Sequence, residues 1–152
     1  MKAAQKKYLV RAFKDFKKIY KIKISHISGK IDQNMMEAFF ALHIRRWSKD
    51  GIKSKFNNPT QKQIYLGLSQ LNIDNIGKPI IFILESDGNS VAMCFGYHLK
   101  ERFLYQISAF NPDFIRNSPA QFYSNQFWII WLKRRLIFLI LGMAKKNINS
   151  GL

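Results

Sequence analysis

The chain has 152 residues, of which 47% are hydrophobic and 14% aromatic, and it carries a formal net charge of +16. The length suits one domain with a real core, and the hydrophobic content excludes an intrinsically disordered chain despite the high charge. The single cysteine, Cys94, excludes an intrachain disulfide and is typical of a reducing compartment, so we expect a cytoplasmic protein.

The basic residues concentrate at the two ends of the chain. Residues 1–30 contain ten Lys/Arg and one acid, and residues 133–152 contain five Lys/Arg and no acid. Such ends can bind nucleic acid or an anionic surface, but no nucleic-acid motif accompanies them. We therefore favour solvated lysines and expect no specific nucleic acid. The apolar segment 127–142 is interrupted by three consecutive cations, which argues against a membrane-spanning helix.

The first thirty residues predict a lead-in to the main domain. Apolar side chains recur at helical spacing over residues 3–18 and indicate a basic helix. A short strand over residues 22–26 follows and ends at Ser28-Gly29. We expect residues 1–30 to form this helical lead-in and first strand.

Two helices with clear start signals follow. Asp32 is placed to cap a helix that runs to about Lys49, and a capping box of Thr60 and Gln63 opens a second helix that runs to about Leu71. The first helix has an apolar stripe of correct period, formed by Met36, Phe40, Ile44 and Trp47.

Residues 79–110 predict a three-stranded antiparallel meander. Asp87-Gly88 is a strong signal for a two-residue hairpin turn, and Lys100-Glu101 is a weaker one. These turns predict a register with Leu84 opposite Val91, Phe82 opposite Met93, and Phe95 opposite Gln106. Both faces of the sheet are then mainly apolar, so we expect helices on both sides.

The clearest local signal follows the meander. Ser118 is placed as an N-cap, Pro119 fits the first helical position, and Gln121 completes a capping box for a helix over residues 119–134. The free N–H groups and the dipole of such a helix start suit a phosphate. The alternative is a well-capped helix that binds nothing.

The last apolar run completes the predicted fold. Residues 136–141 indicate a buried strand parallel to the strand over residues 102–110, although their Leu and Ile content also allows them to continue the preceding helix. The order of elements predicts an α/β fold whose mixed sheet has an antiparallel meander and one βαβ crossover. Ligands of such sheets bind where the carboxyl ends of the strands meet a helix start.

Several segments occur in an order that is similar to one enzyme superfamily. They are Ala41–Trp47, the connection from Phe56 to Tyr65, the hairpin Leu84–Ala92, the segment Tyr105–Pro112 and the loop Ser118-Pro119-Ala120. With these segments the chain resembles the GNAT superfamily of acyltransferases from about residue 13 to residue 146. It resembles more closely the branch of the peptidoglycan Fem transferases and the cellulose-biosynthesis (CelD-type) acetyltransferase-like domain.

The resemblance implies transfer of an acyl group from acyl-CoA, such as acetyl-CoA, to an amine or hydroxyl, without a metal. The pantetheine and pyrophosphate of the donor are expected along strand 102–110 and at the start of helix 119–134. The expected donor-binding residues are Ile107, Ser108, Ala109, Arg116, Asn117, Ser118, Ala120 and Gln121. Among them Arg116 carries the guanidinium that suits a phosphate, and its alternative is a solvated loop arginine.

The chain also departs from the family's pattern. Ile137 stands where relatives have an aspartate, and the acidic pair and tyrosine that follow are absent. We therefore expect a truncated GNAT-like domain over residues 31–146 with a tail over residues 147–152, similar to the C-terminal part of a larger enzyme. Two alternatives stay open for such a chain, an acyltransferase that is active and a remnant that has lost activity. Its open sheet edge could pair with another copy of the chain.

Two residues are candidates for acid–base catalysis. His43 has a side chain that ordinarily titrates near neutral pH, as an acid–base catalyst requires. The alternative to a catalytic role is that His43 only packs beside Phe39 and Trp47. Glu85 lies at a predicted strand end, and the resemblance implies that it could deprotonate an amine through a water, as strand-end carboxylates of this superfamily often do. The alternative is that Glu85 is a surface acid flanking a hairpin. No His/Cys cluster has the spacing of metal ligands. The function is therefore expected to be acyl transfer, and the alternative is a non-catalytic basic module that binds nucleic acid or an anionic surface.

Overall fold

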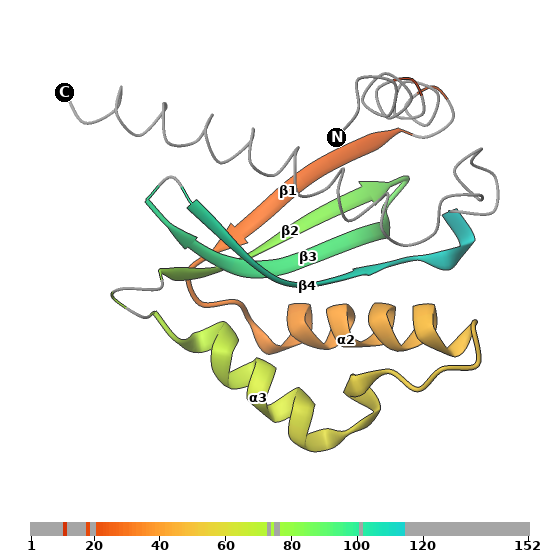
Figure 1. Ribbon diagram of the computed structural model, residues 1–152. Coiled ribbons are helices and arrows are strands. Elements are labelled where there is room, and N and C mark those ends of the chain that lie inside the picture. The colour runs from red at the N-terminus through yellow and green to blue at the C-terminus, as the bar shows by residue number, and fades with distance from the viewer. Residues whose placement is uncertain are drawn as a thin grey trace, which may run out of the picture.

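A four-stranded antiparallel sheet with two helices packed on one of its faces makes up the described part of the chain (Figure 1). The computed structural model describes residues 21–72, 74, 77–100 and 102–114, together with the single positions 11 and 18. In chain order the elements are β1 (Ile22–Ser28), α2 (Gln33–Ser48), the 3-10 helix η1 (Lys55–Asn57), α3 (Pro59–Gln70), β2 (Lys78–Ser86), β3 (Asn89–Leu99), β4 (Arg102–Phe110) and the 3-10 helix η2 (Pro112–Phe114). The predicted α/β fold class is confirmed. The predicted helices 3–18 and 119–134, the strand 136–141 and the crossover lie outside the described residues.

Helix starts follow the local chemistry of their caps. Asp32 caps α2 as predicted, and its Oδ1 accepts a hydrogen bond from the backbone N–H of Met35 at 2.9 Å. The predicted cap of α3 at Thr60 is wrong. Asn58 is the N-cap, because its Oδ1 accepts from the N–H of Thr60 at 2.9 Å and Pro59 takes the first helical position. An Asn-Pro pair therefore starts this helix two residues before the predicted cap.

The strands lie in the order β1–β2–β3–β4, and every neighbouring pair is antiparallel. This confirms the predicted meander and places the first strand beside it. Asp87 and Gly88 form the first turn with φ of 49° and 77°, as a two-residue hairpin with two left-handed positions requires. The second turn contains Lys100 at φ 53°.

The predicted register of the first hairpin is wrong by one residue beyond the turn. Leu84 faces Ala92 instead of Val91, because the register shifts between Leu84 and Glu85. Such a shift is typical of a β-bulge, in which one strand carries an extra residue.

The second hairpin contains a similar shift. Phe95 faces Ile107 instead of Gln106, because the register changes between Phe95 and Gly96. Alternation of apolar residues does not reveal such an extra residue, so a regular hairpin extrapolated from the turn misses it.

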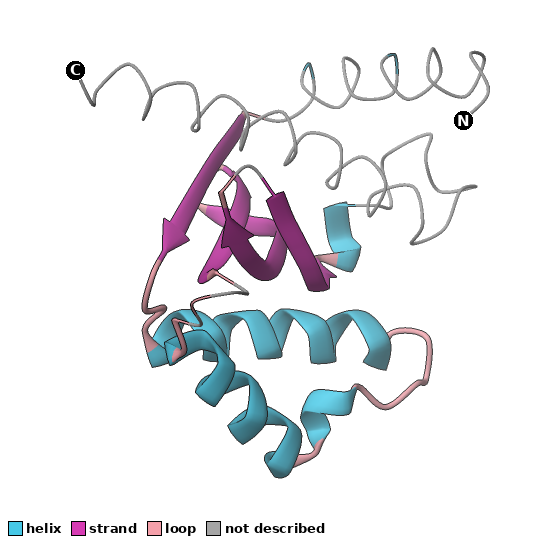
Figure 2. Ribbon diagram, turned by 60° about the vertical axis from the view of Figure 1, so that its left-hand side comes forward, coloured by secondary structure: helices cyan, strands magenta, loops and turns pink. Residues whose placement is uncertain are grey.

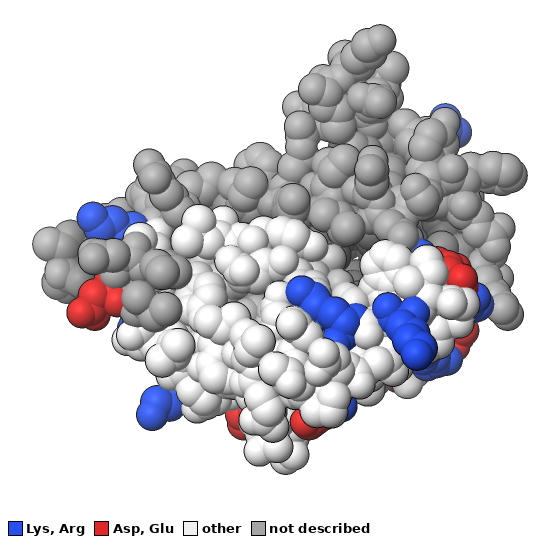
Figure 3. Space-filling model, turned by 60° about the horizontal axis from the view of Figure 1, so that its bottom comes forward, with Lys and Arg blue, Asp and Glu red and all other residues white. Residues whose placement is uncertain are grey.

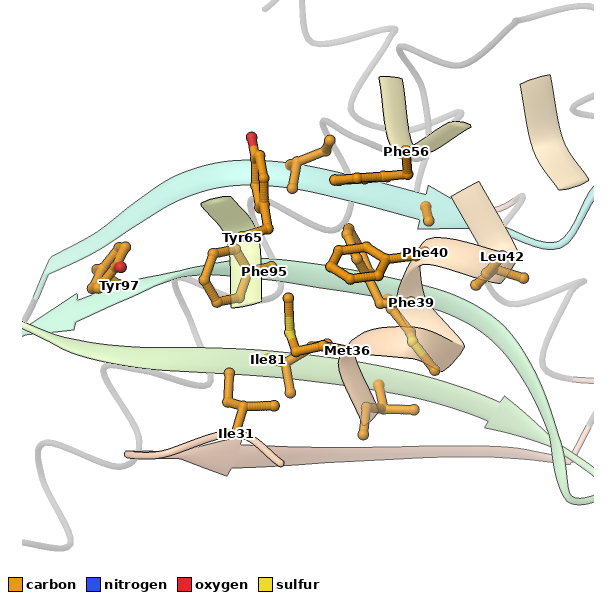
Figure 4. Close-up of a cluster of buried hydrophobic side chains, with 14 residues drawn as sticks. Ile31, Met36, Phe39, Phe40, Leu42, Phe56, Tyr65, Ile81, Phe95 and Tyr97 are labelled. Carbon is orange, nitrogen blue, oxygen red and sulfur yellow. The ribbon is translucent and has the colours of Figure 1, made fainter. Parts of the chain in front are cut away.

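The core lies between the sheet and the helices (Figures 2 and 4). The sheet side of this core consists of Ile81, Ile83, Met93, Phe95, Tyr97, Ile107 and Ala109. The helices and their connection add Met36, Phe39, Phe40, Leu42, Phe56 and Tyr65. The opposite sheet face is also apolar and buried, with Ile80, Phe82, Leu84, Ala92 and Cys94. Among the described elements, α2 and α3 lie on the same face of the sheet.

Two glycines provide a matched test of this packing. A Cβ at Gly96 would clash with the carbonyl oxygen of Leu104 and would lie 2.6 Å from the ring of Phe103. We expect Gly96→Ala to lower the free energy of unfolding by about 1–3 kcal/mol in urea denaturation. At Gly67, within α3, a Cβ would meet nothing within 4 Å. Gly67→Ala should therefore raise the free energy of unfolding by about 0.5–1 kcal/mol. Equal stability of the two variants would contradict the β3–β4 packing described.

Candidate active site

The strands β2 and β4 run in the same direction and end on the same side of the sheet (Figure 1). Ala92 of β3 pairs with Leu84 of β2 and with Phe110 of β4. The half-buried Glu85 and the buried Asn111 each follow this row by one residue. Because neighbouring strands lie about 4.8 Å apart, the backbones of Glu85 and Asn111 are roughly 10 Å apart across β3. We call this side of the sheet, with residues 111–114, the β4 end.

Charged side chains of the last turn of α2 contact the β4 end. Arg45 forms an ion pair with Asp113, and the Nζ of Lys49 lies 3.6 Å from Asp113 Oδ1. The guanidinium of Arg46 lies over the ring of Phe110, 4.7 Å from its centroid. The structure thus brings together two segments that carry the family resemblance, the end of the first helix and the end of β4.

Arg46 combines its charge with burial. Its side chain is only 12% exposed, its Nη1 donates to Asp50 Oδ2, and its guanidinium also lies over the ring of Trp47 at 5.7 Å. A planar guanidinium can stack on rings and bind a carboxylate at once, which a lysine ammonium does less well. Arg46 therefore serves as a packed link between α2 and β4.

A compact turn follows β4. The N–H of Asn111 donates to the carbonyl oxygen of Val91 at 2.7 Å, which extends the pairing with β3 by one residue. The Oδ1 of Asn111 accepts from the N–H of Asp113 at 3.0 Å, and the N–H of Phe114 donates to the Asn111 carbonyl at 3.3 Å. These bonds hold Asp113 where Arg45 and Lys49 reach it.

His43 lies inside the protein, with 7% of its surface exposed. Its Nδ1 is 2.8 Å from the Oγ of Ser54, and the Nε1–H of Trp47 donates to its Nε2 at 3.1 Å. An indole can only donate, so Nε2 is the acceptor and the proton of the neutral ring is on Nδ1, which donates to Ser54. The same Ser54 Oγ accepts from the N–H of Phe56 at 3.0 Å and caps η1.

Burial, with a smaller contribution from the positive charge of Lys55, lowers the pKa of His43 to about 4. The ring is therefore neutral at physiological pH, and both of its nitrogens have a partner. It also packs near Phe39 and Trp47, with ring centroids 6.4 and 6.0 Å away. The geometry favours the packing alternative for His43, and its catalytic role stays a prediction.

The central residues of β4 have two different environments. The side chains of Ile107 and Ala109 belong to the core under the helices, whereas Ser108 faces the other side, where its Oγ is 3.0 Å from the hydroxyl of Tyr105. Burial raises the pKa of Tyr105, so its hydroxyl keeps its proton. Within the described part of the chain, no strand pairs with the outer edge of β4.

The remaining predicted donor-binding residues lie outside the described residues. They are Arg116, Asn117, Ser118, Ala120 and Gln121. Among the residues that the structure describes, no three His, Cys, Asp or Glu side chains are grouped as a metal site requires. None of the helices described is long and apolar enough to cross a membrane.

Sequence reasoning missed the residues that connect α2 with β4. The spacing of Arg45 and Lys49 by one helical turn was a usable signal, because two cations at this spacing can share one carboxylate. Asp113 gave no local signal, because it lies 68 residues from Arg45 in the chain. Ser54 could be recognised only as a possible turn residue before Lys55.

Comparison with known proteins identifies the domain type. The model of a family described as an acetyltransferase (GNAT) domain matches residues 3–124, which is most of the chain. No curated protein matches the chain significantly.

The buried neutral His43 should make stability depend on pH. Its pKa is about 4 in the folded state against an ordinary 6.5, so between these values the unfolded chain takes up a proton that the folded chain does not. The free energy of unfolding should fall as the pH drops from about 6.5 to 4, by at most about 3 kcal/mol. Urea denaturation at several pH values measures this slope. His43→Gln should flatten it, whereas the change of the exposed His26 to Gln should not. A slope that persists in His43→Gln would contradict the assignment.

Proposed function

Because the chain belongs to the acetyltransferase (GNAT) domain family, we propose that it transfers an acyl group from acyl-CoA to an amine or hydroxyl acceptor. Acetyl-CoA is the simplest donor of this kind. The observation that carries the proposal is the convergence at the β4 end. The end of β4, the backbone of Glu85 and the last turn of α2 lie on the same side of the sheet.

The donor is proposed to lie along β4. Its pantetheine arm contains amide groups, which suit hydrogen bonds with the backbone edge at Ile107, Ser108 and Ala109. The buried side chains of Ile107 and Ala109 hold this edge in place, because they are packed under the helices. The phosphates of the donor would then bind the segment that contains Arg116 and Ser118, as the resemblance implies.

Glu85 is proposed to activate the acceptor. Its carboxylate would take a proton, through a water, from the acceptor amine or hydroxyl, whose nitrogen or oxygen then attacks the thioester carbonyl carbon. The carbon–sulfur bond breaks, and the CoA thiolate leaves and is protonated to the thiol. Because β3 lies between β2 and β4, the acceptor and the water would lie over the end of β3, with Glu85 on one side and the end of β4 on the other. The alternative remains a carboxylate that only flanks the hairpin.

The proposal is tested with the purified full chain. Calorimetry with acetyl-CoA and CoA measures binding, and release of CoA from acetyl-CoA in the presence of amines measures turnover. Saturating acetyl-CoA at about 100 times its Kd should stabilise the fold by about 2.7 kcal/mol. Binding without turnover for any amine would identify an inactive remnant. No binding at millimolar acetyl-CoA, together with steeply salt-dependent binding of DNA or RNA, would favour the non-catalytic basic module.

The role of Glu85 can be separated from donor binding. We expect Glu85→Gln to lower kcat by about 10²–10⁴-fold, because general-base catalysis contributes this much, and to leave the Kd for acetyl-CoA unchanged. Glu37→Gln is the matched control, since Glu37 lies on α2 and its Oε2 is 3.6 Å from the Nζ of Lys62. An unchanged kcat in Glu85→Gln would remove Glu85 from the mechanism.

Two substitutions after β4 should separate donor binding from stability. Arg116→Ala should weaken CoA binding about 10–100-fold, because it removes one charge-assisted contact to a phosphate. Ser118→Ala should instead lower the free energy of unfolding by about 1 kcal/mol through loss of a cap, with a smaller effect on affinity. Calorimetry and thermal unfolding measure the two effects. Equal CoA affinities of the parent and Arg116→Ala would contradict a phosphate contact at that arginine.

A further inference from the structure

Positive charge concentrates where α2 ends. Residues 45–55 contain five Lys/Arg and one acid, whereas the middle of the chain as a whole, residues 31–132, contains ten Lys/Arg and eight acids. We call these five residues the basic rim, and they are Arg45, Arg46, Lys49, Lys53 and Lys55. Figure 3 shows one face of the molecule, on which Lys and Arg side chains (blue) occur in several places with acids (red) near some of them.

The segment that follows α2 is held against the helix. The N–H of Ile52 donates to the carbonyl oxygen of Trp47 at 3.0 Å, and the Oγ of Ser54 bonds to His43 at 2.8 Å. Lys53 stands between these two anchors, so its backbone is fixed beside the last two turns of α2. Its side chain is exposed. The backbone of this part of the rim is therefore held in place by hydrogen bonds to α2.

The acids near the rim do not balance its charge. Asp50 binds Arg46, and Asp113 binds Arg45 and approaches Lys49. Among the ion pairs of the described residues, none includes Lys53 or Lys55. The Nζ of Lys55 donates to the hydroxyl of Tyr65 at 2.9 Å, a contact that leaves its positive charge in place. The helix dipole favours cations in the last turn of α2, but Lys53 and Lys55 lie beyond that turn.

We propose that the basic rim binds a carboxylate or phosphate of the acyl acceptor, so that the acceptor is an amine or hydroxyl compound with a negative charge. This inference rests on the proposed acyl transfer. Asp113 connects the rim to the β4 end, where transfer is proposed to occur. The phosphates of the donor are assigned to residues 116–121, so an anion at the rim comes from the other substrate. Positive charge that is not balanced locally both attracts such a substrate and orients it.

The test compares matched pairs of acceptors that differ in one anionic group. The probes are O-phosphoserine and serine, glutamate and glutamine, and glucosamine 6-phosphate and glucosamine. Acetyl transfer from acetyl-CoA gives kcat/KM, and calorimetry gives the Kd of each probe. The parent should favour the anionic member of at least one pair about tenfold or more, and the preference should shrink as ionic strength rises.

Charge-reversal variants locate the preference. Lys49→Glu combined with Lys53→Glu should abolish it and leave the Kd for acetyl-CoA unchanged. Lys53→Glu alone, which leaves the Lys49–Asp113 contact intact, should reduce it and serves if the double variant unfolds. Lys30→Glu with Lys78→Glu is the control. It makes the same change in net charge at two exposed positions on the side of the sheet opposite Glu85, and it should keep the preference.

Several outcomes would overturn the inference. The first two are equal transfer and binding for both members of every pair, and no binding or transfer of any of the six probes. The third is loss of the preference for anionic acceptors in the control variant. The fourth is weaker acetyl-CoA binding by the rim variants. The last result would mean that the rim binds the donor. Failure of the proposed function is seen separately, as absence of acetyl-CoA binding by the parent protein.

Discussion

The arrangement of the helices depends on the burial of one aromatic ring. Phe56, in the short turn between α2 and α3, has no exposed surface. Its ring centroid lies 4.5 Å from that of Phe40, 4.9 Å from that of His43 and 5.1 Å from that of Tyr65. Each such aromatic pair stabilises the fold by about 0.5–1.5 kcal/mol beyond the contribution of the apolar area that it buries. Because these partners come from both helices, the ring sets how α2, α3 and their connection pack together on the sheet.

This packing also determines the position of the charged groups. Phe56 can enter the core only if the segment before it turns inward, and the bonds of Ser54 to His43 and to the Phe56 N–H hold that turn. The turn keeps Lys53 beside the end of α2. The end of α2 in turn reaches β4 through Arg45 and Asp113. A surface rich in cations is thus positioned by an apolar core. The exposed Arg45–Asp113 ion pair, which is weak on its own, adds to the contact that the largely buried Arg46 makes with the ring of Phe110.

The sequence predicted the features that local chemistry determines. The Asp32 cap and the turn at Asp87-Gly88 are confirmed, because each depends on residues within one turn of the chain. The register of both hairpins was not predictable, since each shift adds a residue that alternation does not reveal. The role of His43 was left open for a similar reason. Trp47 is one helical turn away and could be anticipated, but Ser54 becomes a partner only when the chain folds back.

The candidate site separates its charges in a way that suits an anionic acceptor. A protonated His43 beside Lys55 would place two positive charges in a partly buried region, and burial together with Lys55 keeps the ring neutral. The positive charge therefore stays on the basic rim at the surface, while Glu85 lies one residue before the end of β2 on the same side of the sheet. In the proposed reaction the rim holds the acceptor by its anion, and the amine or hydroxyl at the other end of the acceptor points toward Glu85. An anion near Glu85 would meet like charge, so the rim also determines which end of the acceptor points toward the base and the thioester.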